Sequence, residues 1–203
     1  MKSTLLFTGM AVFSCSILAQ DKISEYDLSI YKDKVFEVQA VEPEASGEFS
    51  FYIDVPPAKD TRAVSLIVDR KKLQDFINNM ETAKALYSEW KAAAIANGVQ
   101  DVSKEIKTEK LKLKAAFIYG SGWHFDFNVT PMWEFRVLEG KQYLIVSNRN
   151  KLLASDNRYI DSNGFLLIFS DETEIDNFLS KLSENSVIEY FASKKSQEDI
   201  FKQ

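Results

Sequence analysis

The side chains best suited to acid–base chemistry lie at alternating positions between residues 124 and 136. His124 and Asp126 are two residues apart, and so are Glu134 and Arg136. Residues two apart in a β-strand place their side chains on the same face of a sheet. An imidazole and two carboxylates on one face could move protons. These four residues are therefore candidate catalytic residues of a hydrolase or lyase that acts on carbohydrates or peptides.

The register of the strands decides whether these side chains meet. A loop at residues 130–132 would join two antiparallel strands and place Asp126 opposite Arg136. A turn at residues 139–140 would then place Arg136 opposite Tyr143, which makes Tyr143 a candidate ligand-binding residue. The same alternation also arises on an ordinary solvated sheet face with cross-strand ion pairs, and we favour that interpretation.

The opposite face of the same strands is apolar in this register. Its aromatic residues alternate with the polar candidates, which places all of them on one side of the sheet. We expect them to pack beneath a long helix as part of the core and to be inaccessible to any ligand. These residues are Trp123, Phe125, Phe127, Trp133 and Phe135.

Other catalytic classes lack the residues that they need. One histidine and one cysteine are too few for a zinc site. The nearest approach to a Gly-x-Ser-x-Gly elbow is residues 119–122, which lack the first glycine and are typical of a break between strands. Residues 161–164 resemble the start of a calcium loop, but Leu166 stands where that loop needs a glycine. No phosphate-binding glycine loop is present, so we expect neither a metal nor a cofactor.

A run of lysines is the main basic feature of the chain. Glu105 and Glu109 interrupt the run, which argues against a site for an anionic partner. We interpret it as a solvated helix face followed by an edge strand, where lysine discourages pairing with other strands. The lysines are Lys104, Lys107, Lys110, Lys112 and Lys114.

The N-terminus has the layout of a secretory signal peptide. Lys2 is followed by an apolar segment at Leu5–Phe13, which is too short to span a bilayer, and by small residues that end at Ala19. We expect cleavage after Ala19, so that residues 1–19 are removed. The alternative is a lipoprotein signal over residues 1–14 with Cys15 lipidated and the protein anchored at the cell envelope. In both cases the chain has no internal disulfide, because Cys15 is its one cysteine.

Length and composition favour a single globular domain. The chain has 203 residues, of which 45% are hydrophobic, and a net charge of −5. The negative charge argues against nucleic acid as a partner. No later segment reaches the roughly 18 apolar residues of a membrane-spanning helix. We expect a polar arm at residues 20–33, one domain at residues 34–191 and a polar tail at residues 192–203.

Hydrophobic periodicity predicts two amphipathic helices. Apolar residues at spacings of three and four indicate a long helix over residues 69–97, with Asp69 as its N-cap and Gly98 as its stop. A capping box marks the start of the second helix, over residues 172–183. A third, mostly charged helix is expected over residues 101–109.

Period-two alternation predicts about eight or nine strands. Three lie between residues 34 and 68, a meander covers residues 111–147, a hairpin covers residues 151–169, and a short edge strand covers residues 187–191. Tight turns between strands imply a mainly antiparallel sheet. We therefore predict an α+β fold with both amphipathic helices packed on one face of the sheet.

These expectations favour a non-enzymatic function outside the cytoplasm. A signal peptide combined with weak catalytic equipment predicts an exported protein that binds another protein or a cell-envelope component. Two alternatives are the hydrolase or lyase described above and a carrier that holds a small apolar ligand between helix 69–97 and the sheet.

Overall fold

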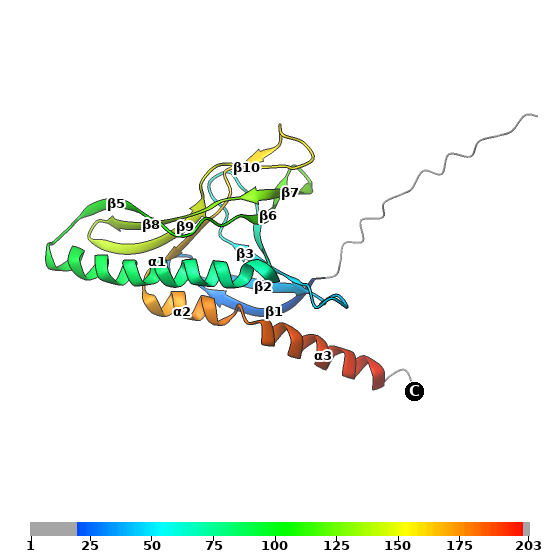
Figure 1. The fold of residues 1–203 in the computed structure, drawn as a ribbon. Coiled ribbons are helices and arrows are strands. Elements are labelled where there is room, and N and C mark those ends of the chain that lie inside the picture. The colour runs from blue at the N-terminus through cyan, green and yellow to red at the C-terminus, as the bar shows by residue number, and fades with distance from the viewer. Residues whose placement is uncertain (1–19, 201–203) are drawn as a thin grey trace, which may run out of the picture.

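The computed structural model describes residues 20–200. The predicted signal peptide and Cys15 therefore lie outside the described residues. Strands and helices of the described chain form an α+β structure, and each strand pairing in it is antiparallel (Figure 1). This result confirms the predicted fold class.

The larger sheet has six strands in the order β1-β2-β3-β4-β6-β7. Neighbours in this order are mostly neighbours in sequence, as expected when tight turns join antiparallel strands. The exception is the step from β4 to β6, where α1 and β5 intervene in the chain. The strands are β1 Gln20–Asp27, β2 Val35–Val41, β3 Ser50–Val55, β4 Val64–Asp69, β6 Leu113–Tyr119 and β7 Gly122–Val129.

A second sheet has four strands in the order β12-β9-β8-β5, and a third has two, β10 and β11. The twelve strands of residues 20–200 exceed the eight or nine that we predicted. The predicted hairpin at 151–169 is largely wrong, because β10 and β11 are two residues long and β12 pairs with β9. The strands are β5 Asp101–Ile106, β8 Pro131–Leu138, β9 Lys141–Asn148, β10 Leu152–Leu153, β11 Asp161–Ser162 and β12 Leu166–Phe169.

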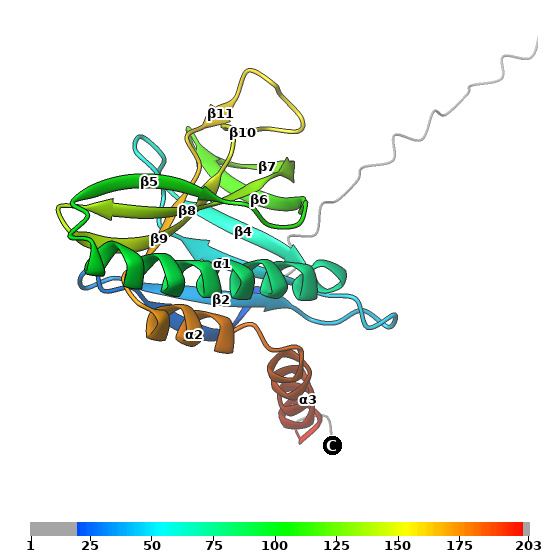
Figure 2. The same ribbon diagram turned by 60° about the vertical axis from the view of Figure 1, so that its left-hand side comes forward.

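Three helices complete the described chain: α1 Arg70–Ala96, α2 Glu172–Ser180 and α3 Glu184–Ile200. The long helix α1 contacts β4 of the larger sheet and β8 and β9 of the smaller one, and α2 lies beside it (Figures 1 and 2). Its buried side follows the predicted stripe of apolar residues. One helix thus packs against both sheets and contributes to the core on each of them. The buried apolar residues of this stripe are Leu73, Phe76, Met80, Ala83, Tyr87 and Ala94.

The start of α1 differs from the prediction in one respect. Asp69 is the N-cap residue, but its side chain makes no capping hydrogen bond. The carboxylate instead accepts from Ser50 Oγ at 2.8 Å and contacts Lys114 Nζ at 2.8 Å across the sheet. Burial acts to raise the pKa of the Asp69 carboxyl, but these two partners outweigh it and hold the pKa below its usual value.

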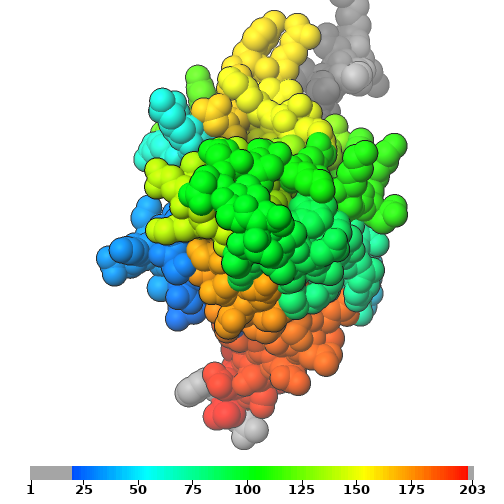
Figure 3. Space-filling view, turned by 90° about the vertical axis from the view of Figure 1, so that its left-hand side faces the viewer, coloured from blue at the N-terminus to red at the C-terminus, as the bar shows by residue number. Residues whose placement is uncertain are grey.

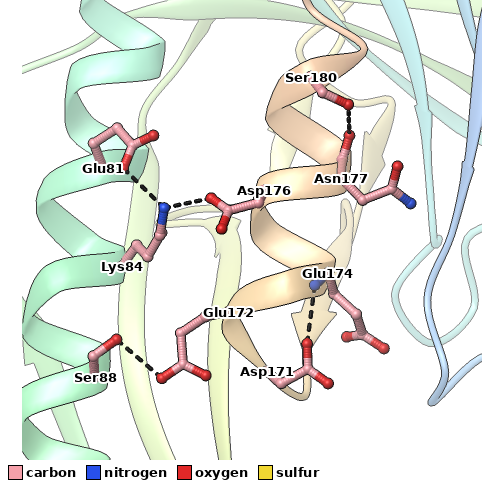
Figure 4. A network of polar contacts seen from close by, with 9 residues as sticks. All are labelled: Glu81, Lys84, Ser88, Asp171, Glu172, Glu174, Asp176, Asn177 and Ser180. Atoms are coloured by element: carbon pink, nitrogen blue, oxygen red, sulfur yellow. Dashed lines mark hydrogen bonds and ion pairs between the residues drawn. The ribbon is translucent and has the colours of Figure 1, made fainter.

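Polar contacts fasten α2 to α1 (Figure 4). Lys84 of α1 contacts Asp176 of α2 and also Glu81, at 3.3 Å. Ser88 Oγ donates to Glu172 Oε1 at 3.0 Å. The predicted cap of α2 is present as well, because Asp171 Oδ1 accepts from the main-chain N–H three residues later at 3.0 Å.

The charged helix predicted over residues 101–109 is wrong. Residues 101–106 form β5, which pairs along its whole length with β8. Val102 and Ile106 face the core, while Lys104 and Glu105 are exposed. Val102 and Ile106 are four residues apart, a spacing that fits one face of a helix as well as of a strand, so pairing with β8 decides the conformation.

Both ends of the described chain are also more ordered than the sequence suggested. The predicted polar arm at residues 20–33 contains β1, which is anchored by Tyr26 and Leu28, each 2% exposed. The predicted edge strand at residues 187–191 and much of the predicted tail belong to α3. Val187 and Phe191 are buried at helical spacing, which satisfies the apolar residues that we assigned to a strand. Figure 3 shows α3 at one end of the molecule and the chain around β10 and β11 at the opposite end.

Candidate functional site

The strand β7 pairs with β6 and not with β8. Tyr119 lies opposite Gly122, so the two strands are joined by a two-residue turn whose first residue, Gly120, has a φ of 60°. At the other end of β7, one residue, Thr130, separates it from β8. One residue is too short for a hairpin, and the chain therefore passes from the larger sheet into the smaller one. The predicted pairing of Asp126 with Arg136 is wrong for this reason.

A β-bulge reverses the faces of β7. Leu113 lies opposite Val129 and Ala115 lies opposite Asp126, so three residues of β7 span what two residues of β6 span. Val129 and Asp126 are both buried although they are three residues apart. Side chains before the bulge consequently point away from the faces that strict alternation assigns to them.

The reversal turns three large rings toward solvent. Trp123 is 52% exposed, Phe125 is 41% exposed and Phe127 is 60% exposed. The rings of Phe125 and Phe127 are nearly parallel, with centroids 6.2 Å apart and planes 24° apart. We call these three residues the aromatic strip. Our expectation that they belong to the core is wrong, whereas Trp133 and Phe135 are buried as expected.

The aromatic strip continues across the larger sheet on its outer face. The register places Phe125 opposite Ala116, Ala116 opposite Ser65, and Ser65 opposite Asp54. The other face carries the core residues, which cluster with the buried side of α1. The aromatic strip and the neighbouring row of Ala116, Ser65 and Asp54 therefore lie on the face of the sheet away from α1.

Asp54 is the acidic residue of this row. Its pKa is raised above the usual value, mainly because burial disfavours the charged carboxylate and also because Glu37 lies nearby. The outer face thus has an aromatic side at β7 and an acidic side at β3, with the small residues Ala116 and Ser65 between them.

Asp126 has a structural role in the observed fold, because its carboxylate accepts two main-chain hydrogen bonds. Its Oδ1 accepts from the main-chain N–H of Asn128 at 2.8 Å, and its Oδ2 accepts from that of Leu153 at 2.9 Å. The carboxylate therefore holds the bulge and the strand β10 together. A group with both oxygens engaged by amides is suited to stabilising a fold.

The other candidate catalytic residues are dispersed. His124 Nδ1 lies 3.7 Å from Asp156 in the chain after β10. Glu134 accepts from Ser103 Oγ at 2.7 Å, and Arg136 pairs with Asp101 at 3.2 Å. Asp126 and His124 thus lie in one sheet, and Glu134 and Arg136 lie in the other. The predicted position of Tyr143 opposite Arg136 is confirmed.

Two cavities open on the surface of residues 20–200. One, of about 690 Å³, lies beside the link between β1 and β2 and is bordered by α2. The other, of about 490 Å³, lies beside the link between β5 and β6. Neither is lined by the candidate catalytic residues, and neither lies between α1 and the sheets, where we expected a carrier to hold its ligand. Sequence reasoning missed the aromatic strip because a bulge leaves no mark in the alternation of residue types.

Residues 20–200 contain neither a metal-binding cluster nor a helix that could span a membrane. No cluster of three or more acidic, histidine or cysteine side chains in that range is arranged to hold a metal ion. None of the helices described there is long and apolar enough to cross a bilayer.

No family model, no curated protein and no solved structure matches the chain.

Proposed function

We propose that this protein is an exported, non-enzymatic binding protein that holds another protein or a cell-envelope component on its aromatic strip. The observation that carries the proposal is the exposure of Trp123, Phe125 and Phe127 along one strand. Contiguous exposed apolar surface of this kind is typical of interaction sites, and aromatic residues are enriched in them.

Energetics support the same proposal. Full burial of an exposed large apolar side chain contributes about 1.5–3 kcal/mol, and about half of that gain remains for each of these half-exposed rings, so three adjacent rings still offer a partner a substantial gain. In the free protein these rings contribute little to the core. Their rigid side chains also lose little conformational entropy on binding, which favours affinity.

The enzymatic alternative has less support. Proton transfer requires an acid and a base within hydrogen-bond reach of the same substrate atom or of a bridging water. His124 and Asp126 lie in one sheet and Glu134 in the other, and Asp126 already accepts two main-chain hydrogen bonds.

The proposed export rests on the N-terminal pattern alone. Lys2, the apolar segment Leu5–Phe13 and the small residues before Gln20 are typical of a signal peptide. A location outside the cytoplasm is consistent with a partner from the cell envelope.

Affinity capture from a cell-envelope fraction tests the proposal. The bait proteins are the unmodified protein, the strip variant Trp123→Ser/Phe127→Ser, and the control variant Val35→Ser/Ile188→Ser, which changes two exposed apolar residues outside the strip. We expect one or more components to be captured by the unmodified protein and the control, with affinity for the strip variant reduced about 30-fold or more, since hot-spot residues contribute about 2 kcal/mol.

Two outcomes would overturn the proposal. One is that the unmodified protein captures no component. The other is that the strip variant captures the same components with the same affinity. Matching urea-unfolding curves for the three proteins establish that a loss of capture comes from the surface and not from misfolding.

A further inference from the structure

We propose that the cavity beside the link between β5 and β6 binds an amphipathic anion, that is, a molecule with an apolar chain and one anionic head group. This site is separate from the aromatic strip and does not depend on the function proposed above. Its volume of about 490 Å³ lies within the range of about 300–1,000 Å³ that is usual for small-ligand sites. Figure 2 shows β5 and β8 side by side, and the cavity lies where β5 ends and β8 begins.

The interior of the cavity is apolar. Most of the apolar side chains that line it are buried, and Met132 is partly exposed. The indole N–H of Trp133 donates to Met80 Sδ at 3.3 Å, so its polar atom is satisfied within the core. The wall therefore offers a ligand apolar contact and does not need a polar group in return. The apolar lining residues are Ile106, Leu111, Pro131, Met132 and Trp133.

The rim of the cavity is basic. Lys107, Lys110 and Lys112 are exposed, and none of them pairs with an acidic group of residues 20–200. Arg149 forms an ion pair with Glu105. Four cations and two carboxylates line the cavity, which leaves an excess of two positive charges on a chain whose net charge is −5.

The other two members of the lysine run have different positions. Lys104 Nζ lies 3.6 Å from the centroid of the Trp90 ring, and Lys114 pairs with Asp69. The prediction that the whole run forms a solvated helix face followed by an edge strand is therefore wrong. Three of the five lysines gather around one apolar opening.

The loop that carries these lysines is held in place before any ligand binds. Asn79 of α1, which is 3% exposed, donates through Nδ2 to the main-chain oxygen of Glu109 at 3.0 Å. Leu111 is buried in the core. On the opposite wall, the N–H of Arg149 donates to the main-chain oxygen of Thr130 at 3.0 Å. A fixed loop loses little entropy on binding, which favours affinity.

The combination of an apolar interior with a cationic rim selects the ligand class. An alkyl chain gains free energy as it leaves water for the interior, at about 0.8 kcal/mol for each buried CH₂ group. A carboxylate or phosphate at the mouth gains hydrogen bonds and charge attraction from the lysines. A neutral alcohol of equal chain length has only the first contribution, and a small anion without a long alkyl chain has only the second.

Calorimetric titration with dodecanoate, below its micelle-forming concentration, tests the proposal. The variants are Lys107→Gln/Lys110→Gln/Lys112→Gln and, as a control with the same change of charge, Lys59→Gln/Lys71→Gln/Lys141→Gln, all exposed lysines away from the cavity. We expect the unmodified protein and the control to bind dodecanoate equally and the cavity variant to bind at least tenfold more weakly. Affinity should also fall as salt is raised.

Companion ligands separate the two parts of the site. Dodecanol and acetate should each bind at least tenfold more weakly than dodecanoate. A separate titration with dodecyl phosphate in place of dodecanoate distinguishes a phospholipid-like head group from that of a fatty acid. Absence of binding to both anionic ligands would overturn the proposal. Equal binding of dodecanoate and dodecanol, or equal losses in the two triple variants, would overturn it as well.

Discussion

Asp126 controls the direction of the aromatic strip through two hydrogen bonds. Its carboxylate accepts from the main-chain N–H groups of Asn128 and Leu153, and the residue is 8% exposed. The amide of Asn128 belongs to the bulge, and the bulge is what turns Trp123 and Phe127 toward solvent. A residue that we considered for catalysis is thus a determinant of the surface that we propose for binding.

Replacing Asp126 with alanine should destabilise the protein. Hydrogen bonds to a charged group contribute about 1.5–3 kcal/mol, and two amides lose their acceptor, so we expect the free energy of unfolding to fall by about 2 kcal/mol or more. Urea unfolding measures this change. The control is Asp156→Ala, an exposed carboxylate in the same part of the molecule, which should cost about 0.5 kcal/mol or less. Equal losses in the two variants would contradict the role of Asp126.

The Asp54 carboxyl should make stability depend on pH. Its pKa in the folded protein is raised above the usual 3.8, so the folded state binds this proton more tightly than the unfolded state does. Ionisation therefore costs stability at neutral pH, and the cost disappears as pH falls below 3.8. We expect Asp54→Asn to raise the free energy of unfolding at pH 7 and to have no such effect below pH 3.8. An equal effect at both pH values in urea titrations would contradict this explanation.

At the scale of elements, α2 depends on its first turn. Asp171 accepts from the main-chain N–H of Glu174, and the Glu174 carboxylate accepts from the N–H of Ser170 at 2.7 Å. Glu174 also accepts from the N–H of Ser29 at 2.8 Å, which ties α2 to the end of β1. The cap therefore helps to seat the helix as well as to start it.

Replacing Asp171 with alanine should cost about 1 kcal/mol, the usual contribution of an N-cap side chain. Thr173→Ala, an exposed change in the same turn, is the matched control and should be close to neutral. Thermal and urea unfolding of the two variants measure the difference. A neutral Asp171→Ala would show that the packing of α2 on α1 outweighs its cap.

Elements with strong local signals were predictable, and elements that depend on distant pairing were not. The helix α1 has a long apolar stripe and stops at Gly98, whose φ is 61°. The register of β8 on β9 follows from a two-residue turn, and Arg136 lies opposite Tyr143 as predicted. By contrast, β5 is a strand because β8 lies beside it, and α3 is a helix whose apolar residues also fit a short strand.

At the scale of the whole molecule, the passage of the chain between two sheets at Thr130 determines where the surfaces lie. It separates His124 and Asp126 from Glu134 and Arg136, and so divides the predicted catalytic group. No local feature of the sequence distinguishes this passage from a hairpin, because both alternate between polar and apolar residues. The candidate residues could therefore be chosen from the sequence, but their arrangement could not.

Export is the prediction that concerns the N-terminal residues. We expect the intact mass of the protein recovered from outside the cytoplasm to correspond to a chain that begins at Gln20. A mass that includes lipid on Cys15 would instead establish the lipoprotein alternative. Recovery of the full chain from the cytoplasm, with Met1 or Lys2 at its N-terminus, would contradict both.

Fluorine NMR of protein that contains 5-fluorotryptophan tests the exposure of the aromatic strip directly. The chain has three tryptophans, and single Trp→Phe variants assign their resonances. We predict that the Trp123 resonance shifts between H₂O and D₂O and broadens when a captured envelope component is added, while the resonance of buried Trp133 does neither. If Trp123 shows the insensitivity to solvent of Trp133, the ring lies in the core and the binding surface does not exist.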